Sequence, residues 1–335
     1  MNINKIIISR TDKIGDVILT LPVAGILREH YPKCEILFIG ESYTQPIINA
    51  CDHVDTFINW SELKKKSREA QVESFRQVNA DVIVHVFPNK DIARVAQKAK
   101  IPLRIGTGHR IYHLLTCNKR LFFSRKKSGL HESQLNLKLL KPLQINSIPP
   151  REKLSEYYGL SKTPPLDEKH SSFLSTEKTN LILHPKSKGS AREWGLDNFG
   201  RLIDLLPSEK YNILISGTKE DRTLLEGFLS KYSEKTTDLT GRMSLEQFIA
   251  FISRCDALVA ASTGPLHIAA ALGLAAIGIF PPIRPMHPGR WAPLGKKAHA
   301  LVLDKECNKC RKTLDCDCIK KIKPEEVVRA LEKEQ

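Results

Sequence analysis

The sequence predicts an α/β protein of two Rossmann-like, doubly wound domains that face a cleft. Its 335 residues exceed what one ordinary hydrophobic core holds. Short apolar runs alternate with helical stripes in both halves, a pattern typical of parallel sheets covered by helices. A stretch rich in Pro, Ser and Lys at 145–176 interrupts this alternation. We therefore expect an N-terminal domain over 1–160 and a C-terminal domain over 161–335.

The first half opens with a β-α-β unit. An apolar strand is expected at 5–9, then a polar turn, and a second strand at 35–40. Pro22 falls inside the helical stripe between them and should kink or restart the helix. That stripe consists of Val17, Leu21, Ala24 and Leu27. Further strands are expected at 81–87 and 103–106.

The second half repeats the alternation more clearly. Strands are expected at 180–183, 211–216, 257–261 and 275–280. Helices are expected from about Lys219 and over 265–272, and Ser244 with Gln247 matches the capping box of a third. In such sheets, ligands bind at the carboxyl ends of the strands.

The composition indicates a soluble protein with an anionic partner. The formal net charge is +15, which suits nucleic acid, anionic lipid or a phosphorylated substrate. Few aromatic residues lie between the basic clusters, which disfavours binding of single-stranded nucleic acid. No apolar run reaches the ~18–20 residues of a membrane span, and the N-terminus lacks the layout of a signal peptide. We expect a cytoplasmic protein.

The sharpest local pattern is the stretch 262–267, Ser-Thr-Gly-Pro-Leu-His, between a strand and a helix. Thr263 can cap the helix, Gly264 allows a ligand to approach the backbone, and Pro265 suits the first helical position. A helix N-terminus at a sheet edge is an anion site. The alternative is a plain capped turn, with His267 as a packed helix residue.

A second cluster follows the strand at 180–183. Its loop carries two hydroxyls, a Gly and three cations, Lys186, Lys188 and Arg192, which together suit a diphosphate. The alternative is a solvated basic loop. Neither loop matches a P-loop and no GxGxxG follows a strand, so a P-loop NTPase or a standard NAD enzyme is disfavoured.

Asp16 is the candidate catalytic group of the first half. It ends the turn at 10–16, where a helix starts beside the predicted cleft. A carboxylate there can act as a general base, and it can equally cap the helix. Local sequence leaves both open.

Together these features resemble the heptosyltransferase family, inverting glycosyltransferases of GT-B fold that move heptose from ADP-heptose onto lipopolysaccharide core. The resemblance spans nearly the whole chain, and its most specific block is 262–273. The other matching residues are Gly15-Asp16-Val17, Thr20-Leu21-Pro22, Arg104-Ile105-Gly106, His184-Pro185, Trp194, Phe199, Gly217, Glu220 and Met243-Ser244-Leu245.

The resemblance implies roles for several of these residues and their neighbours. Asp16 would deprotonate the acceptor hydroxyl, with Arg10 and Lys13 on the acceptor side. Glu220 would reach the ribose and Met243 would border the adenine. The donor diphosphate would be held by Ser187, Arg192, Thr263, Gly264 and Pro265, and Lys188 and His267 are further candidates for donor binding. Neither a catalytic metal nor a further cofactor is implied.

The chain departs from the family pattern in three places. Lys186 stands where many relatives have Gly, and Ser262 where some have Asp. The Pro-rich segment 280–291 also differs, and it begins where a strand ends. Its Arg284, His287 and Arg290 are candidates for donor or acceptor contacts. These departures leave the identity of the donor open.

Four clustered cysteines form a separate candidate site. Cys307, Cys310, Cys316 and Cys318 could bind zinc as a four-thiolate structural site or form a redox bridge. The Cys-x-Cys spacing is tight for such a site, and Lys309, Arg311 and Lys312 would offset the charge of the thiolates. The other four cysteines are expected to be ordinary reduced thiols.

We therefore expect a monomeric, metal-independent glycosyltransferase acting on a lipid-linked or phosphorylated glycan. Its charge is compatible with docking on the anionic inner face of the inner membrane. Two other classes stay open, a sugar-nucleotide epimerase of the same architecture and a non-enzymatic nucleic-acid-binding protein. Isomerisation of the donor without acceptor would favour the first. Salt-sensitive binding to random DNA would favour the second.

Overall fold

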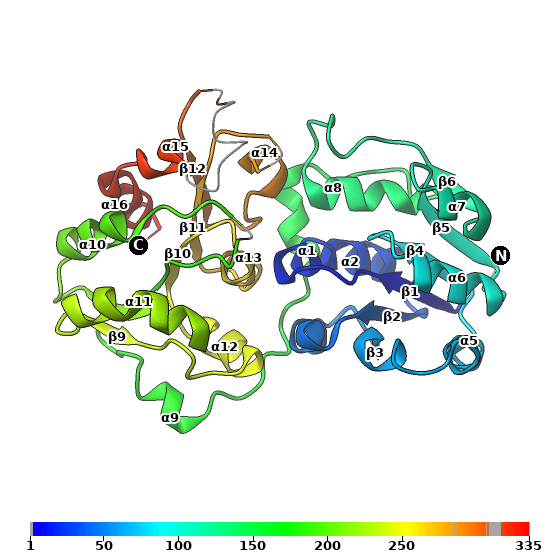
Figure 1. Ribbon diagram of the computed structural model, residues 1–335, viewed down its shortest axis with the longest axis horizontal. Coiled ribbons are helices and arrows are strands. Elements are labelled where there is room, and N and C mark those ends of the chain that lie inside the picture. The colour runs from blue at the N-terminus through cyan, green and yellow to red at the C-terminus, as the bar shows by residue number, and fades with distance from the viewer. Residues whose placement is uncertain (1–2, 190, 285, 306, 308–315, 335) are drawn as a thin grey trace. The chain divides into compact units, whose positions relative to one another are not determined.

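The computed structural model divides the chain into two compact units, Met1–Lys162 and Thr163–Gln335. It describes residues 3–189, 191–284, 286–305, 307 and 316–334. Each unit contains one six-stranded, all-parallel sheet with helices packed against it (Figure 1). The predicted α/β class with two doubly wound units is confirmed. The division at 162/163 falls two residues after the expected boundary.

The sheet of the first unit has the order β3-β2-β1-β4-β5-β6. Its strands are β1 (Lys5–Ser9), β2 (Glu35–Gly40), β3 (Thr56–Asn59), β4 (Val82–His85), β5 (Leu103–Thr107) and β6 (Lys119–Leu121). Its helices are α1 (Ile14–Ile18), α2 (Leu21–His30), α3 (Gln45–Asn49), α4 (Trp60–Leu63), α5 (Arg68–Val78), α6 (Lys90–Lys98), α7 (Ile111–Thr116) and α8 (Glu132–Leu137). The order reverses between β1 and β4, which are direct neighbours.

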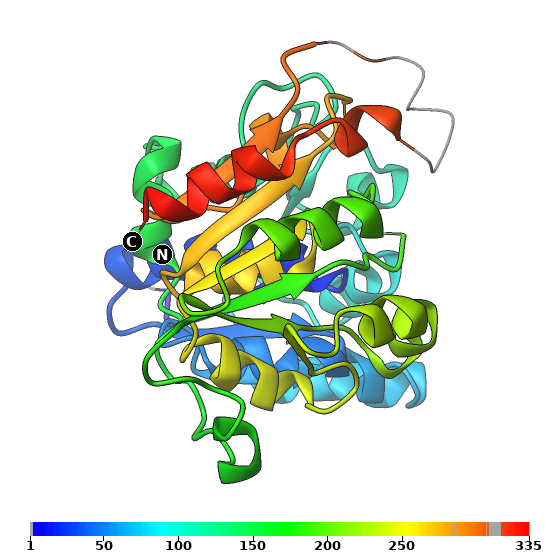
Figure 2. The same cartoon turned by 90° about the vertical axis from the view of Figure 1, so that its left-hand side faces the viewer.

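The second unit repeats this topology in the order β12-β11-β10-β7-β8-β9. Its strands are β7 (Thr179–His184), β8 (Tyr211–Ile215), β9 (Thr236–Asp238), β10 (Ala257–Ala261), β11 (Ala275–Phe280) and β12 (Ala298–Val302). Its helices are α9 (Glu168–Ser171), α10 (Leu196–Leu205), α11 (Lys219–Lys231), α12 (Leu245–Ile252), α13 (Gly264–Ala271), α14 (Pro288–Trp291), α15 (Asp317–Lys320) and α16 (Pro324–Glu332). The C-terminal α16 packs along α10 (Figure 2).

The apolar character of the inner strands explains both sheets. Residues 6–8 of β1 and all of β10 and β11 are buried, as expected for parallel strands covered on both faces. Pro22 restarts the first helix as predicted, because α1 ends at Ile18 and α2 begins at Leu21. No helix in the described part of the chain is long and apolar enough to cross a membrane.

The capping box expected at α12 forms only in part. Ser244 accepts a hydrogen bond from the Gln247 backbone N–H at 3.2 Å, as predicted. The Gln247 side chain instead accepts from the Asp167 backbone N–H at 2.9 Å and donates to the Pro165 carbonyl at 3.1 Å. The competing contacts with the segment before α9 explain the difference.

We predict that Gly25→Ala destabilises the first unit by about 1–3 kcal/mol. Alanine is normally the better helix former, but a Cβ at Gly25 would lie 2.4 Å from the Tyr157 carbonyl oxygen. The tight packing between α2 and the 3₁₀ helix Arg151–Tyr157 therefore requires glycine. Urea unfolding measures the change. Gly227→Ala on α11 is the control: a Cβ there meets nothing within 4 Å and should stabilise by up to about 1 kcal/mol.

Candidate active site

The sheet topology selects one loop region in each unit. The strand order reverses between β1 and β4 in the first unit and between β7 and β10 in the second. Ligands of doubly wound folds bind outside the carboxyl ends of the strands at this reversal. The predicted stretches 10–16, 184–194 and 262–267 all follow one of these strands.

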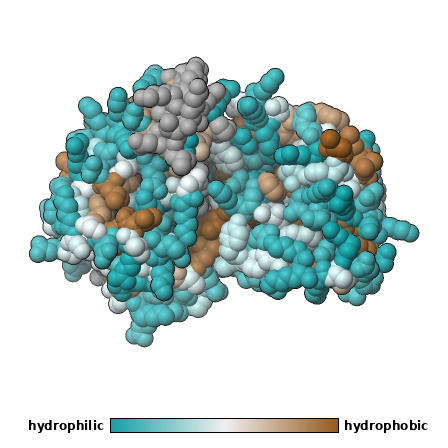
Figure 3. Space-filling view, viewed as in Figure 1, coloured by the Kyte–Doolittle hydropathy of each residue, from teal (hydrophilic) through white to brown (hydrophobic). Residues whose placement is uncertain are grey.

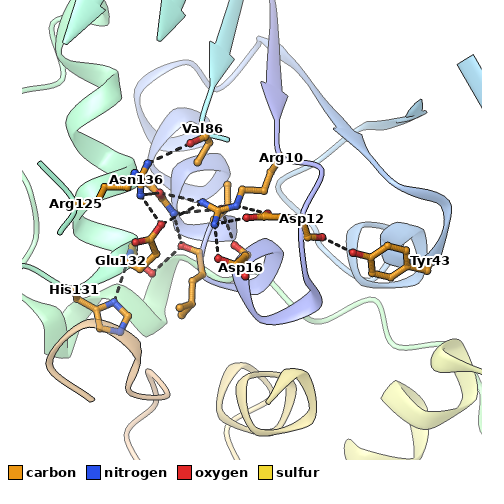
Figure 4. A network of polar contacts seen from close by, with 12 residues as sticks. Arg10, Asp12, Asp16, Tyr43, Val86, Arg125, His131, Glu132 and Asn136 are labelled. Carbon is orange, nitrogen blue, oxygen red and sulfur yellow. Dashed lines mark hydrogen bonds and ion pairs between the residues drawn. The ribbon is translucent and has the colours of Figure 1, made fainter. Parts of the chain in front are cut away.

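In the first unit, Arg10 organises a buried ionic network (Figure 4). Its side chain is 3% exposed. It donates two hydrogen bonds to the Asp12 carboxylate, at 2.6 and 2.9 Å, and one to Asp16 Oδ1 at 2.5 Å. Burial alone would lower the pKa of Arg10, but the carboxylates of Asp12, Asp16 and Glu132 outweigh burial and raise it. The guanidinium is thus a fixed cation that orients Asp16.

Residues of helix α8, more than a hundred positions along the chain from Arg10, complete the network. Arg10 Nη1 lies 3.4 Å from both the Glu132 carboxylate and the Asn136 amide oxygen. Arg125 pairs with Glu132 and donates to Asn136 at 2.8 Å. Ser133 and Asn136 donate to the Leu19 carbonyl at 2.8 and 3.2 Å, which fixes α8 against the end of α1. Arg125, Glu132, Ser133 and Asn136 were not among the site residues predicted from the sequence.

Asp16 lies in the first turn of α1, whose N-cap residue is Lys13. Asp16 therefore does not cap this helix, and its carboxylate turns to Arg10 instead. The side chain remains 19% exposed, so a ligand can still reach it. Burial raises the pKa of Asp16 to about 6, with Arg10 opposing the rise and the charges of Asp12 and Glu132 adding to it. The group is ionised at neutral pH, yet it is a stronger base than an ordinary Asp.

Arg10 and Lys13 differ in how accessible their side chains are to a ligand. Lys13 is exposed and makes no side-chain cap on α1, whereas Arg10 is buried among carboxylates. An acceptor role for either residue stays a prediction. The Tyr43 hydroxyl, which donates to the Asp12 carbonyl at 2.6 Å, extends the polar rim of the network.

In the second unit, Thr263 is the N-cap residue of α13, which begins at Gly264, one residue earlier than predicted. The Thr263 side chain makes no capping hydrogen bond. Its hydroxyl is buried and has no hydrogen-bond partner among the described residues. The first N–H groups of a helix also lack intrahelical partners. An anion placed here would meet an unsatisfied hydroxyl, free N–H groups and the positive end of the helix.

The loop after β7 lies beside this helix start, because Ala260 of β10 pairs with His184 of β7. Ser187 and Arg192 are both buried, at 6% and 8% exposed. Lys186 pairs with Glu193 at 2.6 Å, so the loop neutralises one of its own cations. The structure thus brings the two predicted phosphate loops together on one sheet edge.

The other predicted donor residues are more scattered. Lys188, with a φ of +47°, pairs with Glu220 at 3.1 Å, and both side chains are largely exposed. Hydrogen bonds from Thr218 and Lys188 lower the pKa of Glu220 to about 2. Met243 is half-buried just before α12. His267 is buried within α13, and its role in donor binding stays a prediction.

The segment after β11 has mainly structural contacts. Arg284 is exposed. His287 caps α14 by accepting from the Gly289 backbone N–H at 3.0 Å, and Arg290 lies over the Trp291 ring at 4.7 Å. Substrate contacts of these residues stay predictions.

The cysteine hypothesis falls partly outside the described residues, because Cys310 is not among them. Cys316 and Cys318 are buried in the core of the second unit, and Cys307 packs against the same core. Within the described ranges, no three metal-ligating side chains are grouped to hold a metal ion. The four-thiolate site stays a prediction.

The chain is similar to known sugar transferases. Residues 68–319 match the model of glycosyltransferase family 9 (heptosyltransferase). Lipooligosaccharide heptosyltransferase 2 of Campylobacter jejuni is 25% identical over 335 residues, covering 97% of this chain and 96% of that protein. The fold is similar to the solved structure of Escherichia coli ADP-heptose lps heptosyltransferase II (TM-score 0.76, 20% identity, 99% and 98% coverage). It also resembles E. coli heptosyltransferase WaaC, solved with ADP-2-deoxy-2-fluoro heptose (TM-score 0.70, 16% identity, 99% and 100% coverage).

Proposed function

The chain belongs to glycosyltransferase family 9, the heptosyltransferase family, and we propose that it transfers heptose from ADP-heptose to a lipopolysaccharide-core or related glycan, with Asp16 as the general base. Membership of this family makes the chain a glycosyltransferase. An epimerase or a non-enzymatic nucleic-acid-binding protein, the two alternatives from the sequence, would lie outside it.

The observation that carries the proposal is the Asp16 carboxylate, partly exposed at the strand reversal with a pKa raised to about 6. The acceptor hydroxyl gives its proton to Asp16 as its oxygen attacks the anomeric carbon. The bond from that carbon to the β-phosphate oxygen breaks, and ADP leaves with the electron pair. Attack opposite the leaving group inverts the configuration at the anomeric carbon. A base poised near the working pH suits the proton transfer.

The proposed reaction also requires that the leaving group be stabilised. In-line displacement places growing negative charge on the departing diphosphate, which needs stabilising by fixed positive groups. The N-terminus of α13, the Thr263 hydroxyl and the buried Arg192 supply donors of the required sign. We propose that they hold the diphosphate of ADP-heptose, with Glu220 and Met243 toward the nucleoside.

A transfer assay tests the reaction class. Purified protein is given ADP-heptose with and without heptose-deficient lipopolysaccharide, and the glycan product is followed by mass spectrometry. Acceptor-dependent gain of one heptose with release of ADP supports the proposal. Isomerisation of the donor in the absence of acceptor would instead show that the protein is an epimerase. Turnover of other nucleotide-sugars but not of ADP-heptose would show that the transferred sugar is not heptose.

Removal of divalent cations should leave transfer unchanged within about twofold, since helix N–H groups and Arg side chains can neutralise a diphosphate. Initial rates with EDTA, with and without added Mg²⁺, make the comparison. Loss of turnover in EDTA that Mg²⁺ restores would contradict a metal-independent reaction.

We predict that Thr263→Val changes stability and nucleotide affinity in opposite directions. Removing a buried hydroxyl that lacks a partner should stabilise the unliganded protein by about 1 kcal/mol. Losing a donor to phosphate should weaken ADP binding by about three- to tenfold. Thermal unfolding and calorimetric titration measure the two effects. Thr263→Ser, which keeps the hydroxyl, is the control; equal loss of affinity in both variants would rule out the hydroxyl as a phosphate ligand.

A further inference from the structure

An apolar patch stands out on the surface of the first unit. Among the described residues, several large apolar side chains are exposed, and four of these fall within twelve positions. They are Ile111 at 81% exposed, Leu114 at 48%, Leu115 at 77% and Phe122 at 70%. We call these four residues the α7 patch. Figure 3 shows brown side chains gathered over α7 and β6 at this end of the unit.

The patch is rigidly presented. On α7, His113 and Thr116 face inward and are buried, so Ile111, Leu114 and Leu115 occupy the opposite face at i, i+3 and i+4 spacing. Gln97 of α6 donates to the Leu115 carbonyl at 2.7 Å, and Arg120 donates to the Leu114 carbonyl at 2.8 Å.

Phe122 belongs to the same surface. Its ring lies over Gly108, where a Cβ would come within 2.3 Å of the ring carbons. It also meets the ring of His109 edge-on at a centroid distance of 6.0 Å. Because both contacts lie just before α7, the aromatic ring is held in place beside the helix.

The stretch of chain that contains the patch carries charge of one sign. Residues 92–131 contain ten Lys and Arg and not one Asp or Glu. Eight of these cations are exposed: Arg94, Lys98, Lys100, Arg110, Lys119, Arg120, Lys126 and Lys127. They lie on α6, which packs against α7, on β6, and on the turns that flank these elements.

We propose that the α7 patch inserts into the headgroup layer of an anionic phospholipid bilayer while the surrounding Lys and Arg bind lipid phosphates. Apolar side chains within a basic surface are what interfacial membrane binding requires. A second copy fits worse, because a symmetric contact would bring the same cations face to face. Four side chains are also few beside the roughly 20–30 residues a side of a stable interface.

The inference goes beyond the proposed reaction, and vesicle binding tests it without donor or acceptor. The intact protein is sedimented with phosphatidylcholine vesicles, with or without about 30% phosphatidylglycerol. We expect binding to the anionic vesicles alone, falling steeply as NaCl rises from about 0.1 to 0.5 M. Ile111→Ser/Leu115→Ser/Phe122→Ser should weaken binding about tenfold or more. Lys126→Gln/Lys127→Gln should weaken it about fivefold for each charge removed.

Two double variants serve as matched controls. Leu205→Ser/Leu224→Ser removes exposed apolar side chains of the second unit. Lys65→Gln/Lys66→Gln removes exposed charges beyond β3, at the opposite edge of the first sheet. Both should bind vesicles as the unaltered protein does, and all variants should keep the melting temperature and its shift with ADP.

Three results would overturn the inference. They are equal binding to neutral vesicles, unchanged binding of the triple Ser variant, and a concentration-dependent dimer in light scattering that this variant abolishes. Failure of heptosyl transfer would leave the vesicle result standing, since neither substrate enters that measurement.

Discussion

Asp16→Asn lowers kcat by about 10²–10⁴-fold, the range typical of losing a general base, while ADP binds as before. Asn keeps the shape of Asp and an oxygen to accept from Arg10, which lies 2.5 Å away, but it cannot take a proton at neutral pH. The loss therefore concerns chemistry rather than fold. Steady-state kinetics with titration of ADP separates the two. Retained turnover in a folded, ADP-binding variant would remove Asp16 as the base.

The pH dependence gives a second, independent signature of Asp16. Its pKa is raised to about 6, chiefly by burial, and only the deprotonated carboxylate accepts the acceptor proton. We expect kcat/KM to be level above about pH 6 and to fall about tenfold per pH unit below it. Asp16→Asn should abolish this acid limb.

Asp12→Asn should move the acid limb of the kcat/KM profile to lower pH. It removes a like charge that raises the pKa of Asp16, and it removes one of the carboxylates that compete with Asp16 for the Arg10 guanidinium. The pH profile of kcat/KM in this variant checks the direction of the shift. If Asp16→Asn still shows an acid limb near pH 6, the titrating group is not Asp16.

The inner strands were predictable because burial on both faces makes them continuously apolar. The expected strands at 5–9, 35–40, 257–261 and 275–280 match β1, β2, β10 and β11. The edge strands were not predicted from the sequence. One of them, β6, shows the reason, because it consists of Lys-Arg-Leu. β9, Thr-Thr-Asp, is equally short and polar. Such segments carry no periodicity, and only pairing with a neighbouring strand makes them part of a sheet.

The candidate site was predictable where its residues follow a strand directly. The stretches around Asp16 and Thr263 have local patterns, and topology alone places them at a strand reversal. The contributions of Arg125, Glu132 and Asn136 have no local signal, because tertiary packing of α8 brings them to Arg10. The unpartnered hydroxyl of Thr263 is likewise visible only in three dimensions.

Arg10→Met should destabilise the first unit by about 3–5 kcal/mol at pH 7, the cost of breaking a buried ion pair. Arg10 is almost fully buried among three carboxylates. Without Arg10, Arg125 is the one cation left in the network in Figure 4 to balance the carboxylates of Asp12, Asp16 and Glu132. Urea unfolding measures the loss. Arg76→Met, which breaks an exposed pair with Glu73, is the control and should change stability by less than about 0.5 kcal/mol.

The stability lost in Arg10→Met should be smaller at lower pH. Crowded, buried carboxylates have pKa values raised above those of the unfolded chain, so the folded variant binds more protons than the unfolded one. Its stability therefore rises as pH falls, and the deficit should shrink between about pH 7 and pH 5. The additional change Glu132→Gln removes one uncompensated charge, and the double variant should recover part of the stability at pH 7. A deficit equal at both pH values, and unchanged in the double variant, would show that Arg10 stabilises the unit by packing rather than by charge.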